Sequence, residues 1–405
     1  MATIARGLEG VVLTETRLSD VDGERGHLII GGVPVEELAP QARFEDVLFL
    51  LWHDRFPRDD EYRDLREALV AQRTLPVATV ALLGAAATRG VPCMDALRMG
   101  VATLSEEEFS PGESVTATRL RHAVALVARF PTIVATYWRL RHGQDPVPPD
   151  PTLGHAANYL YMLTGRAPSP AAVRALETYL NTVVDHGMNA STFTARVIAS
   201  TRSDMVSALV GAVGALKGPL HGGAPGPALD MVFEIQARAA LSRRGIADEA
   251  EAWTRAAVAD GARIMGFGHR VYKVRDPRAE VLGVAATRLF EGVADARLYE
   301  DALCVEAIVL RVLHELKPGR RLETNVEFYT ALLLHGIGLE AELFTPTFAV
   351  ARAGGWTAHV LEQAAEDRLI RPSAAYNGER DRQCPPVKIS SPSVAAAIAC
   401  GAAPA

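Results

Sequence analysis

The sequence lacks the features that mark several common classes of protein. Its 405 residues include only four cysteines and no CxxC pair, so we expect neither a disulfide framework nor a cysteine-based zinc site. No run of the sequence reaches the roughly 18 continuous apolar residues of a membrane-spanning helix. Glu9 interrupts the N-terminus before the apolar core of a signal peptide can form. These observations predict a cytoplasmic protein.

A strong charge of either sign is also missing. The chain has 42 lysines and arginines against 48 aspartates and glutamates, which gives a formal net charge of -6. Nucleic-acid-binding domains are usually clearly basic, so this class of protein is disfavoured. An apolar fraction of 49% and the length of the chain predict a globular protein with more than one domain.

Several nucleotide-binding and metal-binding motifs are incomplete. Gly266 and Gly268 lack the third glycine of a dinucleotide fingerprint, and Lys217 does not follow the glycine that a P-loop requires. His314 is followed by a glutamate but not by the second histidine of a zinc protease. We therefore expect no metal site.

Helical periodicity is abundant. Apolar residues from Val305 to Leu316 recur at intervals of three and four, and the segment 317–319, which reads KPG, ends the pattern. Ser169 before Pro170 predicts an N-cap followed by proline at the first helical position. Strand signals are confined to His27–Ile30, which precedes two glycines and predicts a short hairpin. The expected class is all-α.

Small residues lie along one side of the predicted helix 204–217. They are Ser207, Gly211, Gly214 and Gly218. Because small side chains let two helix backbones approach closely, we expect another helix to pack here. That helix belongs either to the same chain or to a second subunit, and the sequence favours neither.

Two histidines stand in glycine-rich segments. His221 lies in KGPLHGG at 217–223, and His269 lies in GFGHRVYK at 266–273. Four cations follow between residues 269 and 278, namely Arg270, Lys273, Arg275 and Arg278. Guanidinium groups match phosphates and carboxylates in bidentate geometry, so the segment is consistent with a polyanionic ligand. The alternative is a solvated basic surface with two structural histidines.

Three segments together resemble the citrate synthase family. They read DHGMNAST at 185–192, GPLHGG at 218–223, and GFGHRVYKVRDPR at 266–278. They follow the order and the approximate separations of that family's signatures. The likeness begins at the segment GLEGV at 7–11, includes LFTP at 343–346 and RLIRP at 368–372, and covers residues 6–380.

The resemblance implies an all-α homodimer in which each subunit has two helical domains. A large domain would comprise residues 1–221 and 325–382, a smaller mobile domain residues 222–324, and residues 383–405 a flexible tail. Family members condense acetyl-CoA with oxaloacetate to citryl-CoA, which is hydrolysed to citrate and CoA. The similar 2-methylcitrate synthases use propionyl-CoA.

The resemblance also implies roles for individual residues. His221 matches the histidine that hydrogen-bonds the thioester oxygen, and His269 matches the one that polarises the ketone. His186, Arg278 and Arg352 match groups that bind the carboxylates of the acceptor, whereas Arg371 matches an arginine from the other subunit. The backbone of Ile264, Met265, Gly266, Phe267 and Gly268 matches the adenine-recognition segment of CoA, and Lys273 and Arg321 match phosphate-binding cations. CoA would enter as a co-substrate thioester, with no tightly bound cofactor.

The sequence departs from the family at its general base. The family reads Asn-Val-Asp, whereas residues 325–327 read NVE, so that Glu327 stands in place of the aspartate. The extra methylene moves the carboxylate by roughly 1 to 1.5 Å. Thr324 and Glu327 also have capping-box spacing, so the carboxylate either acts as the base or folds back onto its own helix. The usual Ala-Asn-Glu and Tyr-Arg-Gly are likewise replaced, by APG at 224–226 and IGG at 30–32.

Three functional hypotheses follow from this pattern. The first is citrate synthesis from acetyl-CoA and oxaloacetate, with Glu327 as the base. The second keeps the chemistry but uses other substrates, as in a 2-methylcitrate synthase. The third is a catalytically silent dimer that binds CoA or dicarboxylates.

Overall fold

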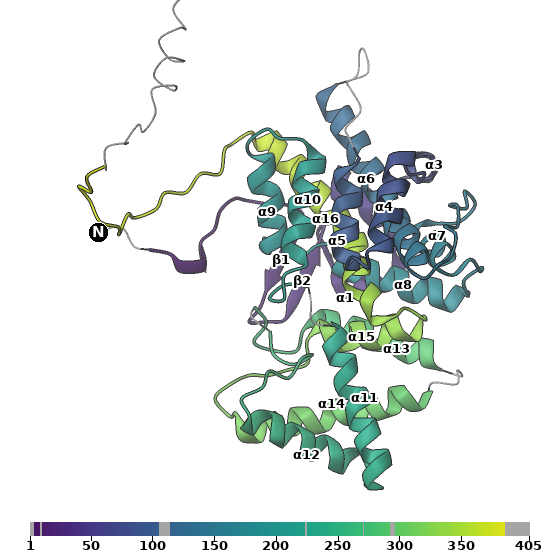
Figure 1. Ribbon diagram of the computed structural model, residues 1–405, viewed down its shortest axis with the longest axis vertical. Helices are drawn as coiled ribbons and strands as arrows, with labels where there is room; N and C mark the ends of the chain where they lie inside the picture. Colours follow the sequence, from purple (N-terminus) through teal and green to yellow (C-terminus); the bar gives the residue numbers. More distant parts are fainter. Residues whose placement is uncertain are drawn as a thin grey trace, which may run out of the picture. The chain divides into compact units, whose positions relative to one another are not determined.

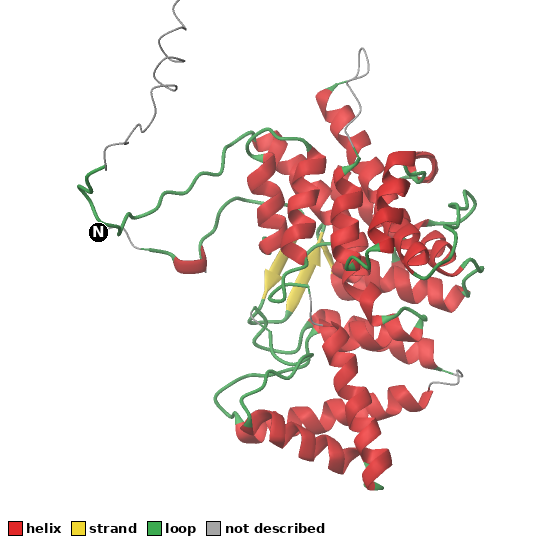
Figure 2. Cartoon of the chain, in the orientation of Figure 1, coloured by secondary structure: helices red, strands yellow, loops and turns green. Residues whose placement is uncertain are grey.

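The chain folds almost entirely into helices. The computed structural model describes residues 4–8, 10–104, 114–222, 225–269, 271–291 and 296–384. Within these ranges the chain forms sixteen α-helices and one small three-stranded sheet. Figures 1 and 2 show how these elements are arranged. The predicted all-α class is therefore confirmed. The predicted flexible tail falls outside the described residues beyond position 384, as do Gly223 and Ala224 of the histidine loop.

The elements follow one another along the chain with short connections. The strands are β1 (Ser19–Asp22), β2 (His27–Ile30) and β3 (Val33–Pro34), and two 3-10 turns, η1 and η2, cover Arg6–Leu8 and Ala341–Leu343. The helices are α1 (Val35–Gln41), α2 (Phe44–His53), α3 (Asp59–Gln72), α4 (Val77–Thr88), α5 (Cys93–Ala102), α6 (Val115–Arg141), α7 (His155–Thr164), α8 (Pro170–Val183), α9 (Ala190–Ala199), α10 (Met205–Leu216), α11 (Pro225–Ser242), α12 (Ile246–Ala259), α13 (Pro277–Phe290), α14 (Ala296–Leu316), α15 (Val326–Gly336) and α16 (Phe344–Glu366).

The chain divides into two compact units. One unit comprises Thr14–Ile370 and contains every helix from α1 to α16. The other combines both chain ends, Met1–Leu13 and Arg371–Ala405. The expected domain boundaries at 221/222 and 324/325 fall inside the first unit, and they remain a prediction.

Local sequence signals account for several element boundaries. Ser169 caps α8, because its hydroxyl accepts the N–H of Ala172 at 3.2 Å, and Pro170 is the first helical residue. The helix predicted to end at Leu316 is α14. The predicted hairpin also forms, with Ile30 of β2 opposite Val33 of β3 and opposite Ser19 of β1.

Helix α16 runs through the core of the larger unit. Nearly all of its side chains are buried, including Trp356 and Arg352 at 0% and 1% exposure. Its glycines permit close helix contacts, since a Cβ on Gly355 would lie 2.2 Å from the carbonyl oxygen of Val184. α16 thereby packs against the segment that follows α8, which leads to His186.

The small-residue side of α10 faces a helix of the same chain. A Cβ on Gly211 would lie 2.3 Å from the side chain of Ile198 in α9 and 3.3 Å from that of Thr194. At Gly211 the packing is therefore internal.

Within the described ranges, no single helix is long and apolar enough to cross a membrane. One pair passes a test of length and composition, α3 with α4, and it is bent by 61°.

Candidate active site

Six of the predicted site residues come from five separate segments of the larger unit. His186 follows α8, and His221 precedes α11. His269 and Arg278 flank the loop that leads into α13, while Glu327 and Arg352 lie on α15 and α16. The positive charge of Arg352 lowers the pKa of both His186 and His221 and stabilises the ionised form of Glu327. One buried charge, that of Arg352, therefore acts on three site residues that are far apart in the sequence.

Two histidines meet around a tyrosine. The rings of His186 and His269 lie 5.9 Å apart at their centroids, and the Tyr272 ring lies 4.9 Å from that of His269. The Tyr272 hydroxyl lies 3.0 Å from Nε2 of His186. Burial, reinforced by Arg278, lowers the pKa of His186 well below its usual value. Tyr272 therefore links two imidazoles, of which His186 is neutral at pH 7.

Backbone amides fix the tautomer of His269. Its Nδ1 accepts the N–H groups of Val271 at 3.0 Å and of Tyr272 at 3.1 Å. Burial lowers the pKa of His269 to about 4, with a further contribution from Arg278, so the ring is neutral at pH 7. Because an imidazole nitrogen that accepts two backbone hydrogen bonds cannot carry the proton, we assign the proton to Nε2. Nη2 of Arg278 lies 3.3 Å from Nε2, and since both groups are donors in this tautomer, that contact is not a hydrogen bond. Nε2 is thus left to donate to a ligand.

Asp276 positions Arg278. Its Oδ1 accepts Nε of Arg278 at 3.0 Å, and its Oδ2 accepts Nη2 at 2.8 Å. The same Oδ2 accepts the backbone N–H of Val326, the first residue of α15, at 3.2 Å. Arg278 and Asp276 are 4% and 1% exposed. One carboxylate therefore joins the acceptor-binding candidate to the helix that carries Glu327.

His221 contacts Ser191 at the start of α9. Ser191 donates its backbone N–H to Nε2 of His221 at 3.3 Å, and its hydroxyl lies 2.8 Å from the same nitrogen. Trp356 donates its indole N–H to the Ser191 hydroxyl at 3.1 Å. Burial lowers the pKa of His221 to about 4, so the ring is neutral at pH 7. Since Nε2 accepts a backbone N–H, the proton lies on Nδ1, which is left to donate to a ligand.

Arg352 is buried with much of its guanidinium unused. Its Nε donates to the carbonyl oxygen of Val183 at 2.7 Å. Within the described residues, its two terminal nitrogens make no hydrogen bond. Burial lowers the pKa of Arg352 to about 10, and Asp185 opposes this effect. The terminal nitrogens are available for a carboxylate, which they can bind in bidentate geometry.

Glu327 does not form the expected capping box. The N-cap of α15 is Asn325, whose side-chain oxygen accepts the N–H of Glu327 at 2.9 Å. Glu327 is therefore the second helical residue, one position too early for a capping box, because Thr324 lies outside the helix. The Thr324 hydroxyl donates instead to Glu306 at 2.6 Å. This part of the expectation was wrong because the helix begins one residue later than the sequence suggested.

The carboxylate of Glu327 is available for chemistry. It makes no hydrogen bond or ion pair with any other described residue. Burial raises its pKa to about 7, against the opposing effect of Arg278. A carboxylate with a pKa near neutrality is suited to abstract a proton and release it again.

The segment expected to recognise CoA is held against the chain that enters α15. Gly268 donates its N–H to Glu323 at 2.7 Å, and Asn325 donates its side-chain amide to the carbonyl of Gly268 at 2.7 Å. Gly266 and Gly268 have φ angles of 88° and 78°, which side-chain-bearing residues rarely adopt. Ile264 and Phe267 are buried and Met265 is half-buried, which leaves this segment to act through its backbone.

The remaining cation candidates are exposed. Lys273 and Arg321 lie on the surface of the larger unit, whereas Arg371 is an exposed residue of the smaller unit. Arg270 falls outside the described residues. Among the described residues, no cluster of three His, Cys, Asp or Glu side chains could hold a metal ion.

Several residues that support the site were not predicted from the sequence. Tyr272, Asp276 and Ser191 all lie inside the three signature segments, so that proximity to the histidines was an available signal. Asp185 begins the first of these segments, whereas its partner His359 lies 174 positions later and gave no such signal.

Asp185 belongs to a buried polar network. It accepts the Ser19 hydroxyl at 2.5 Å and lies 3.1 Å from Nε2 of His359. Arg196 donates to Nδ1 of His359 at 3.2 Å and to Glu362 at 2.6 Å. This network anchors the residue before His186 to α9 and α16.

The fold and the site define an all-α protein in which three neutral imidazoles and a carboxylate accompany two buried guanidiniums. The family profile described as "Citrate synthase, C-terminal domain" matches residues 7–373. The chain is 40% identical over 387 residues to a citrate synthase of Haloferax volcanii, covering 95% of this chain and 98% of that protein. It is 37% identical over 382 residues to a 2-methylcitrate synthase of Mycobacterium tuberculosis, covering 94% and 92%.

The chain is also similar in structure to a solved citrate synthase. It is a ternary complex of carboxymethyl coenzyme A and oxaloacetate with citrate synthase from Thermoplasma acidophilum. It matches at a TM-score of 0.83 and 30% identity, over 96% of this chain and 99% of that chain. The chain belongs to the citrate synthase family.

Proposed function

We propose that the chain condenses an acyl-CoA with a 2-oxo dicarboxylate and then hydrolyses the thioester. The default substrates are acetyl-CoA and oxaloacetate, which would give citrate and CoA. Membership of the family supports this reaction. The observation that carries it in this chain is the unpaired Glu327 carboxylate, with a pKa of about 7, on which Arg352 acts as it does on the neutral His221.

The first step is the formation of a carbon nucleophile. Glu327 takes a proton from the carbon next to the thioester carbonyl. His221 donates a hydrogen bond from Nδ1 to the thioester oxygen, where negative charge develops. A neutral imidazole suits this role because it holds a proton at pH 7 without adding a charge to the empty site.

The second step joins the two carbons. The nucleophilic carbon attacks the ketone carbon of the acceptor, and the electrons of the carbonyl bond move to its oxygen. His269 stabilises that oxygen by a hydrogen bond from Nε2, and the oxygen takes up one proton in exchange for the one that Glu327 removed from carbon, which gives the acyl-CoA adduct and, once Glu327 has lost its proton again, the starting enzyme. Water then cleaves the thioester to release the tricarboxylate and free CoA.

The acceptor would be held by its carboxylates. We assign Arg278, which Asp276 positions, and Arg352, whose terminal nitrogens are unused in the described residues, to this role. His186 would donate a further hydrogen bond. Arg371 would complete the site from a second subunit, so the active form would be a homodimer.

CoA would bind along the segment 264–268, with Lys273 and Arg321 near its phosphates. Residues 222–324 would act as the smaller domain and close over both substrates. Closure would exclude water from the thioester until the carbon–carbon bond exists.

The test is an assay of free thiol release. The purified chain is mixed with acetyl-CoA and oxaloacetate, and the product is identified by mass spectrometry. Citrate formation that disappears in a His269→Ala variant supports the proposal. If neither acetyl-CoA nor propionyl-CoA yields a thiol with oxaloacetate, the default substrates are rejected.

A second candidate is the synthesis of 2-methylcitrate from propionyl-CoA. The replacement of aspartate by Glu327 favours it, because a longer side chain changes the space beside the reacting carbon. Comparison of kcat/KM for the two acyl-CoAs separates the candidates. A silent binding protein would release thiol with neither substrate while still binding CoA.

A further inference from the structure

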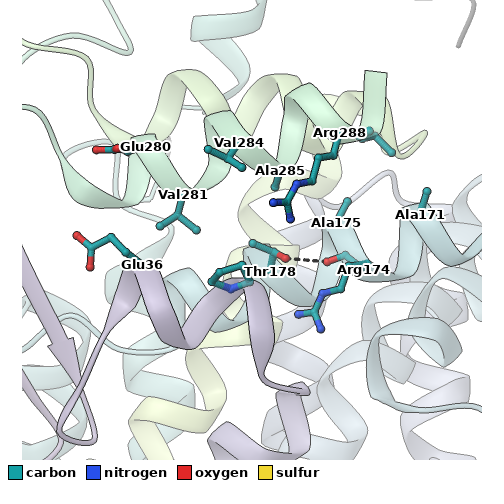
Figure 3. Close-up of a pocket in the computed structure, with 12 residues that line it drawn as sticks. Glu36, Ala171, Arg174, Ala175, Thr178, Glu280, Val281, Val284, Ala285 and Arg288 are labelled. Carbon is teal, nitrogen blue, oxygen red and sulfur yellow. Dashed lines mark hydrogen bonds between the residues drawn. The ribbon is translucent and has the colours of Figure 1, made fainter. Parts of the chain in front are cut away.

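A cavity lies between three helices of the larger unit. It has a volume of about 340 Å³, is lined by α1, α8 and α13, and opens to solvent where Glu36, Val284 and Arg288 are exposed (Figure 3). Helix α13 lines it with residues that follow helical spacing from Val281 to Leu289, and α8 does so from Ala171 to Thr178. Ala175 and Ala285 stand where larger side chains would fill the space. This volume falls within the range of small-molecule sites.

The cavity has chemically different ends. Arg174 and Arg288 project toward one end, while Glu36 and Glu280 lie at the other (Figure 3). Glu280 and Arg288 are two turns apart on α13, which separates their Cα atoms by about 12 Å. Apolar side chains, including Val281, lie between the two ends.

The basic end has unused hydrogen-bond donors. Arg174 donates its Nη2 to the carbonyls of Ala39 and Ala42, and its Nη1 lies 3.2 Å from Glu177. Its Nε is buried without any hydrogen-bond partner and does not reach the cavity, so Arg174 faces a ligand through its terminal nitrogens. Arg288 makes no hydrogen bond or ion pair with the other described residues. These donors favour an anionic group at this end.

The acidic end restricts what else the ligand can carry. Glu36 and Glu280 likewise make no ion pair within the described part of the chain. Their charges would repel a second anionic group, whereas the apolar middle accepts an alkyl chain. We infer that this cavity binds a short-chain monocarboxylate, with its carboxylate on Arg174 and Arg288 and its alkyl chain between α8 and α13.

The cavity adjoins elements of the proposed site without sharing its residues. Glu280 lies two positions after Arg278 on α13, and α8 ends two residues before Asp185. Glu36 also raises the pKa of Tyr272, whose hydroxyl contacts His186. A ligand here would therefore touch two helices that position the site.

The test is calorimetric titration of the full chain with hexanoate, in the presence of saturating oxaloacetate. We expect one hexanoate per chain, and at least tenfold weaker binding of adipate, which has the same length and a second carboxylate. Arg288→Gln should weaken hexanoate binding at least tenfold. Arg297→Gln, which removes an exposed arginine of α14 outside the cavity, should leave it unchanged.

A second variant tests whether hexanoate occupies the cavity itself and is not simply attracted to the charge of Arg288. Ala285→Leu fills the cavity and should abolish hexanoate binding without a loss of cooperative thermal unfolding. The inference is overturned if hexanoate does not bind, if adipate binds equally well, or if Arg288→Gln and Ala285→Leu bind as the unmodified chain does. Loss of hexanoate binding on adding oxaloacetate would instead place it in the acceptor site and would also overturn the inference.

Discussion

Asp276 accepts hydrogen bonds from Arg278 with both carboxylate oxygens, from Nε at 3.0 Å and from Nη2 at 2.8 Å, and the pair is almost completely buried. The same aspartate accepts the first N–H of α15, one residue before Glu327. Asp276 therefore positions both Arg278, which is proposed to hold the acceptor, and the start of the helix that carries Glu327, the proposed base.

Replacement of Asp276 should weaken acceptor binding. Asp276→Asn leaves Arg278 without its ionic partner, and a hydrogen bond to a charged group contributes about 1.5–3 kcal/mol. We expect the KM for oxaloacetate to rise by at least tenfold, while the KM for acetyl-CoA changes much less. Asp260→Asn, at the C-terminus of α12, is the matched control. Equal increases in both KM values would contradict a specific role for this pair.

Removal of the proposed base should abolish most of the turnover. Glu327→Gln keeps the size of the side chain but cannot accept the proton, and general bases contribute roughly 10²- to 10⁴-fold to rate. We expect kcat to fall within that range while oxaloacetate still binds, as measured by steady-state kinetics and calorimetry. A variant with unchanged kcat would exclude Glu327 as the base.

The same variant should be more stable than the unmodified chain at pH 8. Burial raises the pKa of Glu327 to about 7 in the folded protein, above the ordinary carboxyl value of 4.5. Between these values the folded state binds a proton that the unfolded state does not, so the stability of the fold decreases as pH rises. Glu327→Gln removes this penalty, and its melting temperature at pH 8 should therefore be higher. A lower melting temperature would indicate that Glu327 has a structural role.

Activity should rise with pH through neutrality. The base acts only when ionised, and with a pKa of about 7 only about a tenth of the molecules are ionised at pH 6. The logarithm of kcat should increase with unit slope below pH 7 and level off above it, if proton abstraction limits turnover. His221 and His269, whose pKa values lie near 4, should not contribute to this rise of activity with pH. A pH-independent rate between 5.5 and 8 would refute the assignment.

Shortening the base should test whether the site is adapted to glutamate. In Glu327→Asp the carboxylate withdraws by roughly one bond length, and a displacement of about 1 Å can reduce rate on the order of a hundredfold. We expect kcat to fall by that order, with the acyl-CoA preference recorded in parallel. Activity that appears only in the aspartate variant would show that the unmodified chain is catalytically silent.

Close packing of α16 should make Gly355 intolerant of a side chain. Gly355→Ala would place a Cβ 2.2 Å from the carbonyl oxygen of Val184, a contact that forces the backbone to move. We expect a loss of about 1–3 kcal/mol in unfolding free energy, measured by urea denaturation. Gly84→Ala on α4 meets no atom within 4 Å and should stabilise the fold slightly. Equal effects of the two substitutions would contradict this account.

Local sequence patterns predicted several of the helices because their causes lie within a few residues. The period of apolar side chains identified α14, and Ser169 with Pro170 marked the first turn of α8. The start of α15 was predicted one residue too early. Thr324 and Asn325 are both good caps, and the choice depends on the distant Glu306, which takes the Thr324 hydroxyl.

The candidate site was predictable as a set of motifs but not as an arrangement. The glycine-flanked histidines and the arginines were visible in the sequence. Their tautomers were not, because backbone amides of Val271 and Ser191 decide them. The Tyr272–His186 contact spans 86 positions, and no local pattern encodes such a pairing.

The buried Arg196 has a consequence for how the protein is made. Its ionic partner Glu362 lies 166 positions later, near the end of α16, and Asp185 likewise relies on His359. A nascent chain that has not yet emerged past α16 would carry both groups without these hydrogen-bonding partners. We therefore expect ribosome-bound or prematurely terminated chains that lack α16 to lack an ordered His186 segment, so a helix from the C-terminal part of the described chain would be the one that completes the interior.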